Sequence, residues 1–216
     1  MITLYQNLYS HIWQKYSLGP ALHLTHLSNL MGIVEANGLL CKNDMRALPY
    51  LSLANEDVQT LRAGKTVFDR PLHDYVPLYF GKKTPMVAVN GDRNEEMIFF
   101  RYSLNILAWP DVVFSDGNAA TKSTVFHLFQ SIESLDALDT SAVLATRYAG
   151  DLELKRRKQA EILVPSFLSL PEAYEIICFS EGAKKKVEYI LSFDRGLNIP
   201  VRVDASFYFR RDDTAA

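Results

Sequence analysis

DLELKRRKQAEILVP, residues 151–165, places an acidic residue, Glu161, at the start of a short apolar run, residues 162–164. Pro165 ends the run, which is too short for a helix, so the stretch predicts a buried strand. Four cations, residues 155–158, come just before Glu161. Burial penalises a charged carboxylate while nearby cations stabilise it, and catalytic carboxylates often lie in such a balance. The alternative interpretation is a solvated ion pair between Glu161 and one of these cations.

The composition of the whole chain favours one globular domain over residues 1–216. The sequence has 216 residues, of which 48% are hydrophobic and 12% aromatic, so it can bury a full core. The formal net charge is −2. A polyanionic partner would therefore have to meet a local basic patch, because overall attraction is absent.

The cysteines and the first residues indicate a reducing compartment. Cys41 and Cys178 are far apart and lack the C-x-x-C spacing of a metal or redox site, so we expect free thiols. The start has no basic leader before an apolar segment, and no apolar run approaches the length of a membrane span. A soluble, cytoplasmic protein without membrane contact is expected.

An early strand and the helix after it present a cluster of polar side chains. Residues 4–16 have the spacing of a helix, and residues 21–26 read as a strand with His23 and Thr25 on one face. Residues 27–34 predict the next helix, whose first turn contains Asn29. His23 could contact a ligand, although a hydrogen-bonded core histidine is the alternative.

The stretch 73–86, HDYVPLYFGKKTPM, combines aromatic rings with cations. Tyr79 beside Lys82 and Lys83 suits a flat heteroaromatic ligand or single-stranded nucleic acid, because stacking and phosphate contacts work together there. Core tyrosines beside a lysine turn are the alternative. Asn118, in a later turn, could read a base edge with its amide, although turn chemistry explains it equally well.

The rest of the pattern predicts an α+β fold. Residues 40–72 form a long polar segment, and such loops are usually functional or mobile. Arg62, in its one predicted helical turn, could serve a site or be a solvated surface residue. Further predicted strands cover residues 87–89, 97–102, 112–114, 175–179 and 199–209, and further helices cover residues 125–138 and 181–191. Residues 87–102 are expected to form a hairpin. No regular βαβ alternation is present, which argues against a doubly wound sheet.

Several common catalytic motifs are absent from the sequence. It has no G-x-x-x-x-G-K-[ST] loop, no G-x-G-x-x-G after a strand, no H-E-x-x-H and no G-x-S-x-G. P-loop, Rossmann, zincin and esterase chemistries therefore lack the residues that define them. A set of separated polar residues remains: His23, Thr25, Tyr79 and Glu161.

Four stretches in the same order resemble a known family. They are HLTHLSNLMGIVEANGLL (23–40), HDYVPLYFGKKTPM (73–86), FSDGNAA (114–120) and KRRKQAEILV (155–164). Together they resemble the DarT toxins, which attach ADP-ribose to bases of single-stranded DNA, within the His–Tyr–Glu type of ADP-ribosyltransferase. The resemblance is weaker after residue 165. It implies an ADP-ribosyltransferase-like fold with two packed, mainly antiparallel sheets and flanking helices.

The resemblance implies NAD as co-substrate and no required metal. The residues that match the NAD-binding positions are His23, Thr25, Asn29, Tyr79 and Met86. Glu161 matches the catalytic glutamate, which would stabilise positive charge on the ribose, and Arg62 matches an arginine near the reacting centre.

On the DNA side, phosphate and base contacts are expected from Lys82, Lys83, Asn118, Arg156 and Arg157. Thymine-modifying members tend to have a histidine at the position of Asn118 and a denser arginine run where this chain has residues 62–65. This favours guanine over thymine as the acceptor. The family also implies a toxin paired with a macrodomain antitoxin that removes the modification.

Two other readings remain open at this stage. The chain could transfer ADP-ribose to RNA or protein, because a fold alone does not fix the acceptor. It could also be a catalytically inactive module that binds single strands. The retention of His23, Tyr79 and Glu161 together argues against the inactive module.

Overall fold

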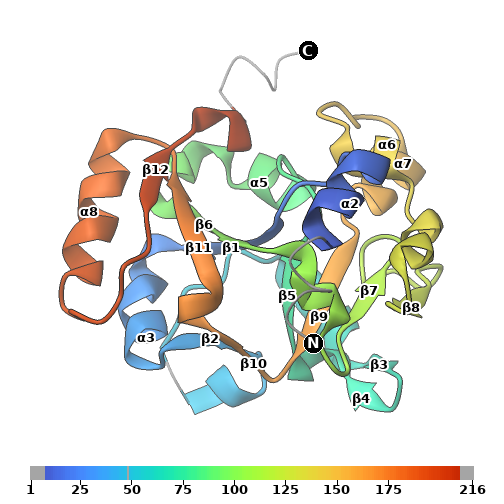
Figure 1. Cartoon of the computed structure of the whole chain (residues 1–216), viewed down its shortest axis with the longest axis horizontal. Helices are drawn as coiled ribbons and strands as arrows, with labels where there is room; N and C mark the ends of the chain where they lie inside the picture. The colour runs from blue at the N-terminus through green and yellow to red at the C-terminus, as the bar shows by residue number, and fades with distance from the viewer. Residues whose placement is uncertain (1–7, 48, 210–216) are drawn as a thin grey trace.

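The computed structural model describes residues 8–47 and 49–209, whose helices and strands are shown in Figure 1. The helices are α2 (Leu8–Tyr16), α3 (Leu30–Glu35), α4 (Glu56–Ala63), α5 (Pro85–Val89), α6 (Thr140–Leu144), α7 (Leu152–Arg157) and α8 (Glu181–Leu191). The strands are β1 (Ala21–His26), β2 (Gly38–Leu40), β3 (Thr66–Val67), β4 (Arg70–Pro71), β5 (Tyr75–Tyr79), β6 (Met97–Tyr102), β7 (Val113–Ser115), β8 (Phe126–Leu128), β9 (Glu161–Pro165), β10 (Phe167–Ser169), β11 (Ala173–Cys178) and β12 (Val201–Val203). Short 3₁₀ helices cover Leu27–Asn29, Asp44–Ala47, Leu72–Asp74, Gly91–Glu96, Leu104–Ala108, Ile132–Ala137, Leu170–Glu172 and Ala205–Phe207.

The main sheet has eight strands in the order β12-β11-β6-β1-β5-β9-β7-β8. Only β11 and β12 pair in parallel, and all other neighbours in this sheet are antiparallel. Two small sheets, β10-β2 and β3-β4, complete the described part. The predicted α+β class with mainly antiparallel strands is therefore confirmed.

The two sheets expected from the sequence are joined at one narrow junction. Strands β1 and β5 meet in a single residue pair, Leu22 opposite Tyr79, whereas β1 pairs with β6 along its whole length. The large sheet thus consists of two halves, β12-β11-β6-β1 and β5-β9-β7-β8. Only the one residue pair between β1 and β5 joins them.

Pro77 explains why pairing across the β1–β5 junction stops. Its carbonyl accepts a hydrogen bond from His23 Nδ1 at 2.9 Å, so the polar backbone edge of Pro77 faces β1. The nitrogen and the carbonyl of one strand residue point to the same neighbour, and proline has no N–H to donate. The ladder between β1 and β5 therefore cannot continue past the pair of Leu22 and Tyr79.

The alternation of side chains along β1 separates two parts of the core. Leu22 and Leu24 pack into a cluster with Phe99 and Ile177, while Ala21 packs into the larger cluster with Phe100. His23 and Thr25 lie opposite Phe100 and Ile98, which belong to the larger cluster. The predicted shared face of His23 and Thr25 is confirmed.

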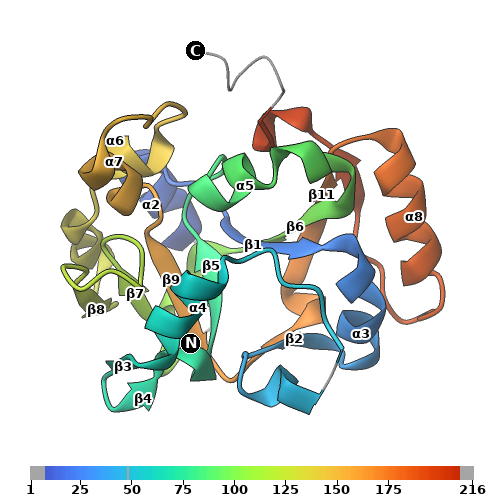
Figure 2. The same cartoon turned by 180° about the vertical axis from the view of Figure 1, so that it is seen from behind.

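The end of the described chain covers the smaller cluster. The Tyr208 hydroxyl lies 3.0 Å from the carbonyls of Met97 in β6 and Ile177 in β11, and it is fully buried. Asn94 Nδ2 donates to the Phe209 carbonyl at 2.7 Å. In Figures 1 and 2 this segment runs from β12 across the top of the molecule toward α5.

Several predicted elements agree with the structure, and others differ. The strands at residues 21–26 and 97–102 and the helix at residues 181–191 have the predicted bounds. The predicted strand at residues 87–89 is wrong, because these residues lie in helix α5, which has Pro85 in its first turn. The expected hairpin does not form, since β6 pairs with β1 and β11.

Two longer predictions are also corrected. Residues 125–138 do not form one helix, because Phe126–Leu128 pair with β7 and Ser131 then begins a 3₁₀ helix. The long strand predicted over residues 199–209 stops after Val203, where the Asp204 side chain accepts from Ser206 N and starts a helical turn. In the predicted first helix, residues 4–7 lie outside the described residues, and α2 begins at Leu8.

Cys41 and Cys178 are both free and buried. Within the described ranges, the search for a helix of sufficient length and apolarity to span a membrane finds none.

Candidate active site

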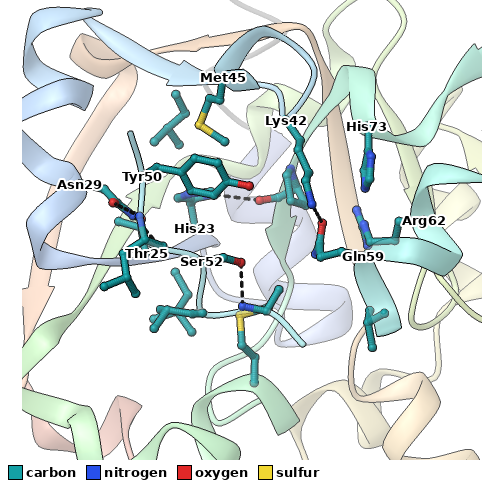
Figure 3. A pocket seen from close by; sticks show the side chains of 18 of the residues that line it. His23, Thr25, Asn29, Lys42, Met45, Tyr50, Ser52, Gln59, Arg62 and His73 are labelled. Carbon is teal, nitrogen blue, oxygen red and sulfur yellow. Dashed lines mark hydrogen bonds between the residues drawn. The ribbon is translucent and has the colours of Figure 1, made fainter. Parts of the chain in front are cut away.

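A cavity of about 680 Å³ opens at the β1–β5 junction. Figure 3 shows it from close by, with side chains from β1, the 3₁₀ helix Leu27–Asn29, α4 and the loop between them. Among its lining residues are these predicted site residues: His23, Thr25, Asn29, Arg62, Tyr79, Met86, Asn118 and Glu161. Residues from both halves of the sheet thus line one cavity, although His23 and Glu161 are 138 positions apart in the sequence.

The Glu161 carboxylate is buried and held by a distant arginine. Arg62 Nη1 lies 3.0 and 2.9 Å from its two oxygens, and Ala119 N donates to Oε1 at 3.0 Å. Glu161 is 3% exposed and Arg62 8% exposed. The alternative of a solvated pair with the preceding cations is wrong, because the partner lies in α4. A fixed anion at the cavity wall results.

Helix α4 brings Arg62 to the carboxylate. Asn55 caps the helix, and its side chain accepts from Asp57 N at 2.8 Å, so the helix has a defined start. Arg62 lies in its last turn, and Figure 2 shows α4 in front of β5 and β9. The predicted helical turn therefore exists, and its arginine is buried rather than solvated.

Tyr79 lies next to Glu161 on the neighbouring strand. The β5–β9 register places the two residues directly opposite each other, so their side chains leave the sheet on the same face. Burial raises the pKa of Tyr79 far above its usual range, and the Glu161 carboxylate adds to this rise. Tyr79 is therefore a neutral phenol that offers its ring to a ligand.

The ring of His23 is fixed by the backbone of β5. Because the Pro77 carbonyl can only accept, His23 Nδ1 is the protonated nitrogen in the 2.9 Å hydrogen bond between them. Burial lowers the pKa of His23, so the neutral form predominates near pH 7. Its Nε2 is then an acceptor, which suits a hydroxyl group of a ligand.

Asn29 ties a loop to the wall of the cavity. Its Nδ2 donates to Thr25 Oγ1 at 3.0 Å and to the Leu51 carbonyl at 2.9 Å, and its Oδ1 accepts from Leu51 N at 2.8 Å. Tyr50 and Ser52, on the same loop, line the cavity beside His23 (Figure 3). Asn29 thus places the loop that covers this part of the site.

The structure adds cavity residues that the sequence did not single out. Lys42 Nζ donates to Gln59 Oε1 at 2.6 Å, and Figure 3 shows both side chains between His23 and Arg62. Burial lowers the pKa of Lys42, and the charge of Arg62 lowers it further. Both residues come from the polar segment 40–72, and the length of that segment was the one signal that pointed to them.

Two amides lie at the rim of the cavity. Asn118 Nδ2 lies 3.3 Å from Gln159 Oε1, and Asn118 Oδ1 accepts from Ala120 N at 2.9 Å. The second bond is the turn chemistry considered from the sequence, and the proposed contact of Asn118 with a base stays a prediction. Lys155 lines the same rim.

The remaining predicted DNA contacts lie outside this cavity. Arg156 makes ion pairs with Asp116 at 2.9 Å and Glu153 at 2.8 Å, and Arg157 pairs with Glu153 at 2.7 Å. These two arginines hold the pKa of Glu153 at about 2. The proposed phosphate clamp by these two arginines stays a prediction.

Lys82 and Lys83 point toward the end of the described chain. Lys82 Nζ donates to Ser206 Oγ at 2.8 Å and lies 5.1 Å from the centre of the Phe207 ring. Lys83 Nζ lies 5.0 Å from the centre of the Phe209 ring. Their proposed role in DNA binding also stays a prediction.

The arrangement suits a dinucleotide whose glycosidic bond is broken. The cavity volume lies in the usual range for cofactor sites. A neutral imidazole, a phenol ring and a buried carboxylate line it together, and the carboxylate is placed to stabilise positive charge that develops on a sugar. Over the described ranges, His, Cys, Asp and Glu side chains form no group of three or more that could hold a metal ion.

Comparison with known proteins agrees with this geometry. A family model described as "ssDNA thymidine ADP-ribosyltransferase, DarT" matches residues 22–209. The DNA ADP-ribosyl transferase of Thermus aquaticus is 33% identical over 202 residues and is matched over 88% of both chains. That of Escherichia coli O127:H6 is 30% identical over 203 residues, which cover 86% of this chain and 91% of the relative. A Thermosipho africanus fusion of a DNA ADP-ribosyl transferase with a DNA ADP-ribosyl glycohydrolase is 24% identical, and 87% of this chain matches 48% of it.

Two solved structures of DarT from Thermus sp. 2.9 have the same fold. The complex with ADP-ribosylated single-stranded DNA superposes with a TM-score of 0.81 at 27% identity, covering 89% of this chain and 97% of that one. The complex with NAD⁺ gives a TM-score of 0.76 at 27% identity, covering 88% and 97%. From the family model, the relatives and the shared fold, the chain belongs to the DarT family of NAD-dependent DNA ADP-ribosyltransferases.

Proposed function

We propose that this chain transfers ADP-ribose from NAD to a base of single-stranded DNA, with guanine favoured over thymine. One observation carries the proposal: His23, Tyr79 and Glu161, from three different strands, line one cavity. The ion pair between Arg62 and Glu161 holds the carboxylate in place at the cavity wall. An inactive binding module has no need for such a buried charge.

NAD would lie along the cavity with its nicotinamide ribose at the Glu161 end. The Tyr79 ring would pack on the nicotinamide, and His23 Nε2 would accept a hydrogen bond from a ribose hydroxyl. Thr25 and Met86 also line the cavity. Lys42, between His23 and Arg62, would partly neutralise the pyrophosphate (Figure 3).

The reaction breaks the bond between the nicotinamide nitrogen and ribose C1′. The bonding electrons leave with the nicotinamide, so positive charge develops on the sugar, and the Glu161 carboxylate stabilises it through the 2′-hydroxyl. A base nitrogen then forms the new bond to C1′. It loses its proton to Glu161 or to a base nearby, which balances the step.

The acceptor would be a base without a pairing partner. A base nitrogen in a duplex is paired and stacked, so a single strand presents it at lower cost. The amides of Asn118 and Gln159 at the rim offer donors and acceptors to its edge. The family model names thymidine, whereas Asn118 in place of histidine and the sparse cations of residues 62–65 support guanine.

We further propose that the chain acts as the toxin of a toxin–antitoxin pair in the cytoplasm. Labelled bases would block DNA templates, so a cell that makes the enzyme would need a second enzyme that removes ADP-ribose. The relative from Thermosipho africanus, in which a transferase is joined to a DNA ADP-ribosyl glycohydrolase, supports such a partner. The partner would be a macrodomain protein.

The test is incubation with NAD and oligonucleotides, followed by mass spectrometry. Single-stranded DNAs in which guanine or thymine is the only reactive base should show which one gains ADP-ribose with release of nicotinamide, and fragment masses should locate it. RNA of the same sequence and a protein mixture test the other acceptors. A salt-sensitive gel shift without any mass change would favour the binding module instead.

The matched variants are Glu161→Gln and Glu188→Gln. Glutamine keeps the shape of Glu161 but removes its charge, and its NH2 group cannot accept from Arg62 as the second carboxylate oxygen does. Transfer should therefore fall by roughly 100- to 1,000-fold while NAD binding is retained. Glu188 is a half-exposed carboxylate in α8, and its variant should label DNA as the unchanged protein does. Undiminished labelling by Glu161→Gln would remove Glu161 from the mechanism.

A further inference from the structure

A second cavity, of about 400 Å³, lies beside the proposed active site. Lys155 and Gln159 line both cavities, so the two spaces share one rim. Thr121 and Ser123 also line the second cavity. A substrate strand whose acceptor base lies at Asn118 would therefore reach this cavity with its next residue.

Three hydrogen-bond donors in this cavity are not used by the protein itself. Within the described part of the chain, the side chains of Thr121, Ser123 and Lys155 make no hydrogen bond or ion pair. Arg156 and Glu153, which also line the cavity, differ in this respect because they pair with each other at 2.8 Å. An anion entering here would thus meet one uncompensated cation and two hydroxyls.

Hydrogen bonds of Lys65 and Thr124 fix the backbone at Thr121 and in the residues before it. Lys65 Nζ donates to the carbonyls of Ala119 at 2.7 Å and Thr121 at 2.6 Å. Thr124 Oγ1 donates to the Asn118 carbonyl at 2.7 Å, and Arg156 Nη1 lies 3.2 Å from the same hydroxyl. The turn that carries Asn118 and the wall that carries Thr121 therefore form one rigid piece.

We infer that this second cavity binds the phosphate of a nucleotide next to the acceptor base, with Lys155 as its cation and Thr121 and Ser123 as neutral donors. The inference rests on the proposed function, which supplies the strand. Phosphate contacts set the register of a nucleic acid on a protein, while base contacts select the sequence. The subsite would thus hold the strand so that the acceptor base reaches Glu161.

The first experiment compares Lys155→Ala with Lys122→Ala. Lys122 is an exposed lysine between Thr121 and Ser123 that does not line the cavity, so it controls for the loss of one positive charge. Lys155→Ala should raise the KM for the oligonucleotide about three- to tenfold at unchanged kcat, and the slope of log KM against log salt should fall by about 0.7. The KM of Lys122→Ala for the oligonucleotide should stay within about twofold of that of the unchanged protein.

The second experiment places one neutral methylphosphonate on either side of the acceptor base. At one of the two linkages, the methylphosphonate should raise the KM of the unchanged protein for the oligonucleotide. It should not raise the KM of Lys155→Ala any further, because both changes remove the same contact. A combined Thr121→Val and Ser123→Ala variant should show a smaller effect in the same direction. Equal KM values for the two lysine variants, or additive effects at both linkages, would overturn the subsite.

Failure of the proposed function would look different. If the unchanged protein labels no oligonucleotide, the same variants and methylphosphonate strands are compared by fluorescence anisotropy, which needs no transfer. Weaker binding by Lys155→Ala than by Lys122→Ala would then support the phosphate site in a protein that only binds. Equal binding would reject it.

Discussion

At the scale of single residues, the ion pair of Arg62 and Glu161 determines orientation more than stability. Both side chains are nearly excluded from water, and taking two charges out of water costs several kcal/mol that their attraction only partly returns. The donation from Ala119 N adds a third contact to the same carboxylate. The site therefore holds a charge that the fold alone does not require.

Arg62→Met should reduce the free energy of unfolding by about 3 to 5 kcal/mol, because Glu161 is then buried without its cation. The double variant Arg62→Met with Glu161→Leu should recover most of this loss and remain without transferase activity. Urea denaturation monitored by fluorescence measures both values. A double variant as unstable as the single one would mean that the pair is needed for the fold.

His23 should make stability depend on pH. Burial lowers its pKa below the ordinary value of 6.5, so below that pH the unfolded chain binds more protons than the folded one. Stability is then fully kept above about pH 6.5 and falls as the pH drops toward the folded pKa. In urea titrations between pH 8 and 5, His23→Asn should show a smaller decrease, and an unchanged pH profile would contradict this assignment.

Polar residues on predicted strands were easier to single out than those of the polar segment 40–72. His23 was identified on a predicted strand where it shares a face with Thr25, and Glu161 because it begins an apolar strand. Lys42 lies in a stretch without periodicity, and Gln59 lies in the short helix α4, where one polar residue looks like any other. Arg62 was recognised from the sequence as a cation that could serve a site, and the family resemblance placed it near the reacting centre. Its burial could not be predicted, because it depends on a strand far along the chain.

At the scale of elements, helix α7 and the turn with Asn118 are packed without space between them. A Cβ at Gly117 would lie 2.4 Å from Arg156 Nη1 and 3.0 Å from the Arg156 carbonyl oxygen. The Asn118 backbone N–H donates to that same carbonyl at 2.9 Å. The position of the Asn118 amide therefore depends on having a glycine at residue 117.

Gly117→Ala should lower stability by about 1 to 3 kcal/mol and reduce DNA labelling more than NAD binding, because the turn must move away from α7. Gly19→Ala is the control, since a Cβ there would meet no atom within 4 Å. Thermal unfolding, NAD titration and oligonucleotide labelling measure the three effects. Equal behaviour of the two variants would show that the turn adapts freely.

Short apolar runs were the least predictable elements. Residues 87–89 suit a strand by composition, but Pro85 and the hydrogen bond from Asn90 Nδ2 to the Met86 carbonyl at 2.9 Å favour a helical turn. Three residues carry too little periodicity to separate the two states. Long elements such as α8 and β6 carry enough, and their bounds were predicted correctly.

At the scale of the whole molecule, the C-terminal part holds elements that are distant in sequence. Tyr208 contacts β6 and β11, and Lys82, after β5, reaches Ser206 and the Phe207 ring. The segment thus connects both halves of the large sheet on one face. The sequence resembled the family only weakly after residue 165, so this role could not be predicted.

Tyr208→Phe should cost about 1 to 3 kcal/mol, because the buried carbonyls of Met97 and Ile177 lose their shared donor. Tyr189→Phe is the control, since Tyr189 is 67% exposed. Urea denaturation separates the two variants, and NAD binding by Tyr208→Phe should persist at low denaturant. No difference between them would mean that water replaces the lost hydroxyl.

The strand order was also beyond the sequence, because a strand pattern specifies which face is apolar but not which neighbour it meets. The α+β class followed from the mixture of elements alone. The sequence does contain Pro77, the residue that limits pairing at the junction. Its effect could not be predicted, because it depends on which strand lies beside β5.

Pro77 also suggests how a cell could escape the proposed toxic activity. A substitution such as Pro77→Val restores an N–H, so β1 and β5 could pair further and close the space where NAD would bind. Selection for survival should therefore enrich variants in which Pro77 is replaced. These variants should unfold at a higher temperature yet bind no NAD. Survivors that instead keep Pro77 and lose heat resistance would show that tighter pairing is not a route to inactivation.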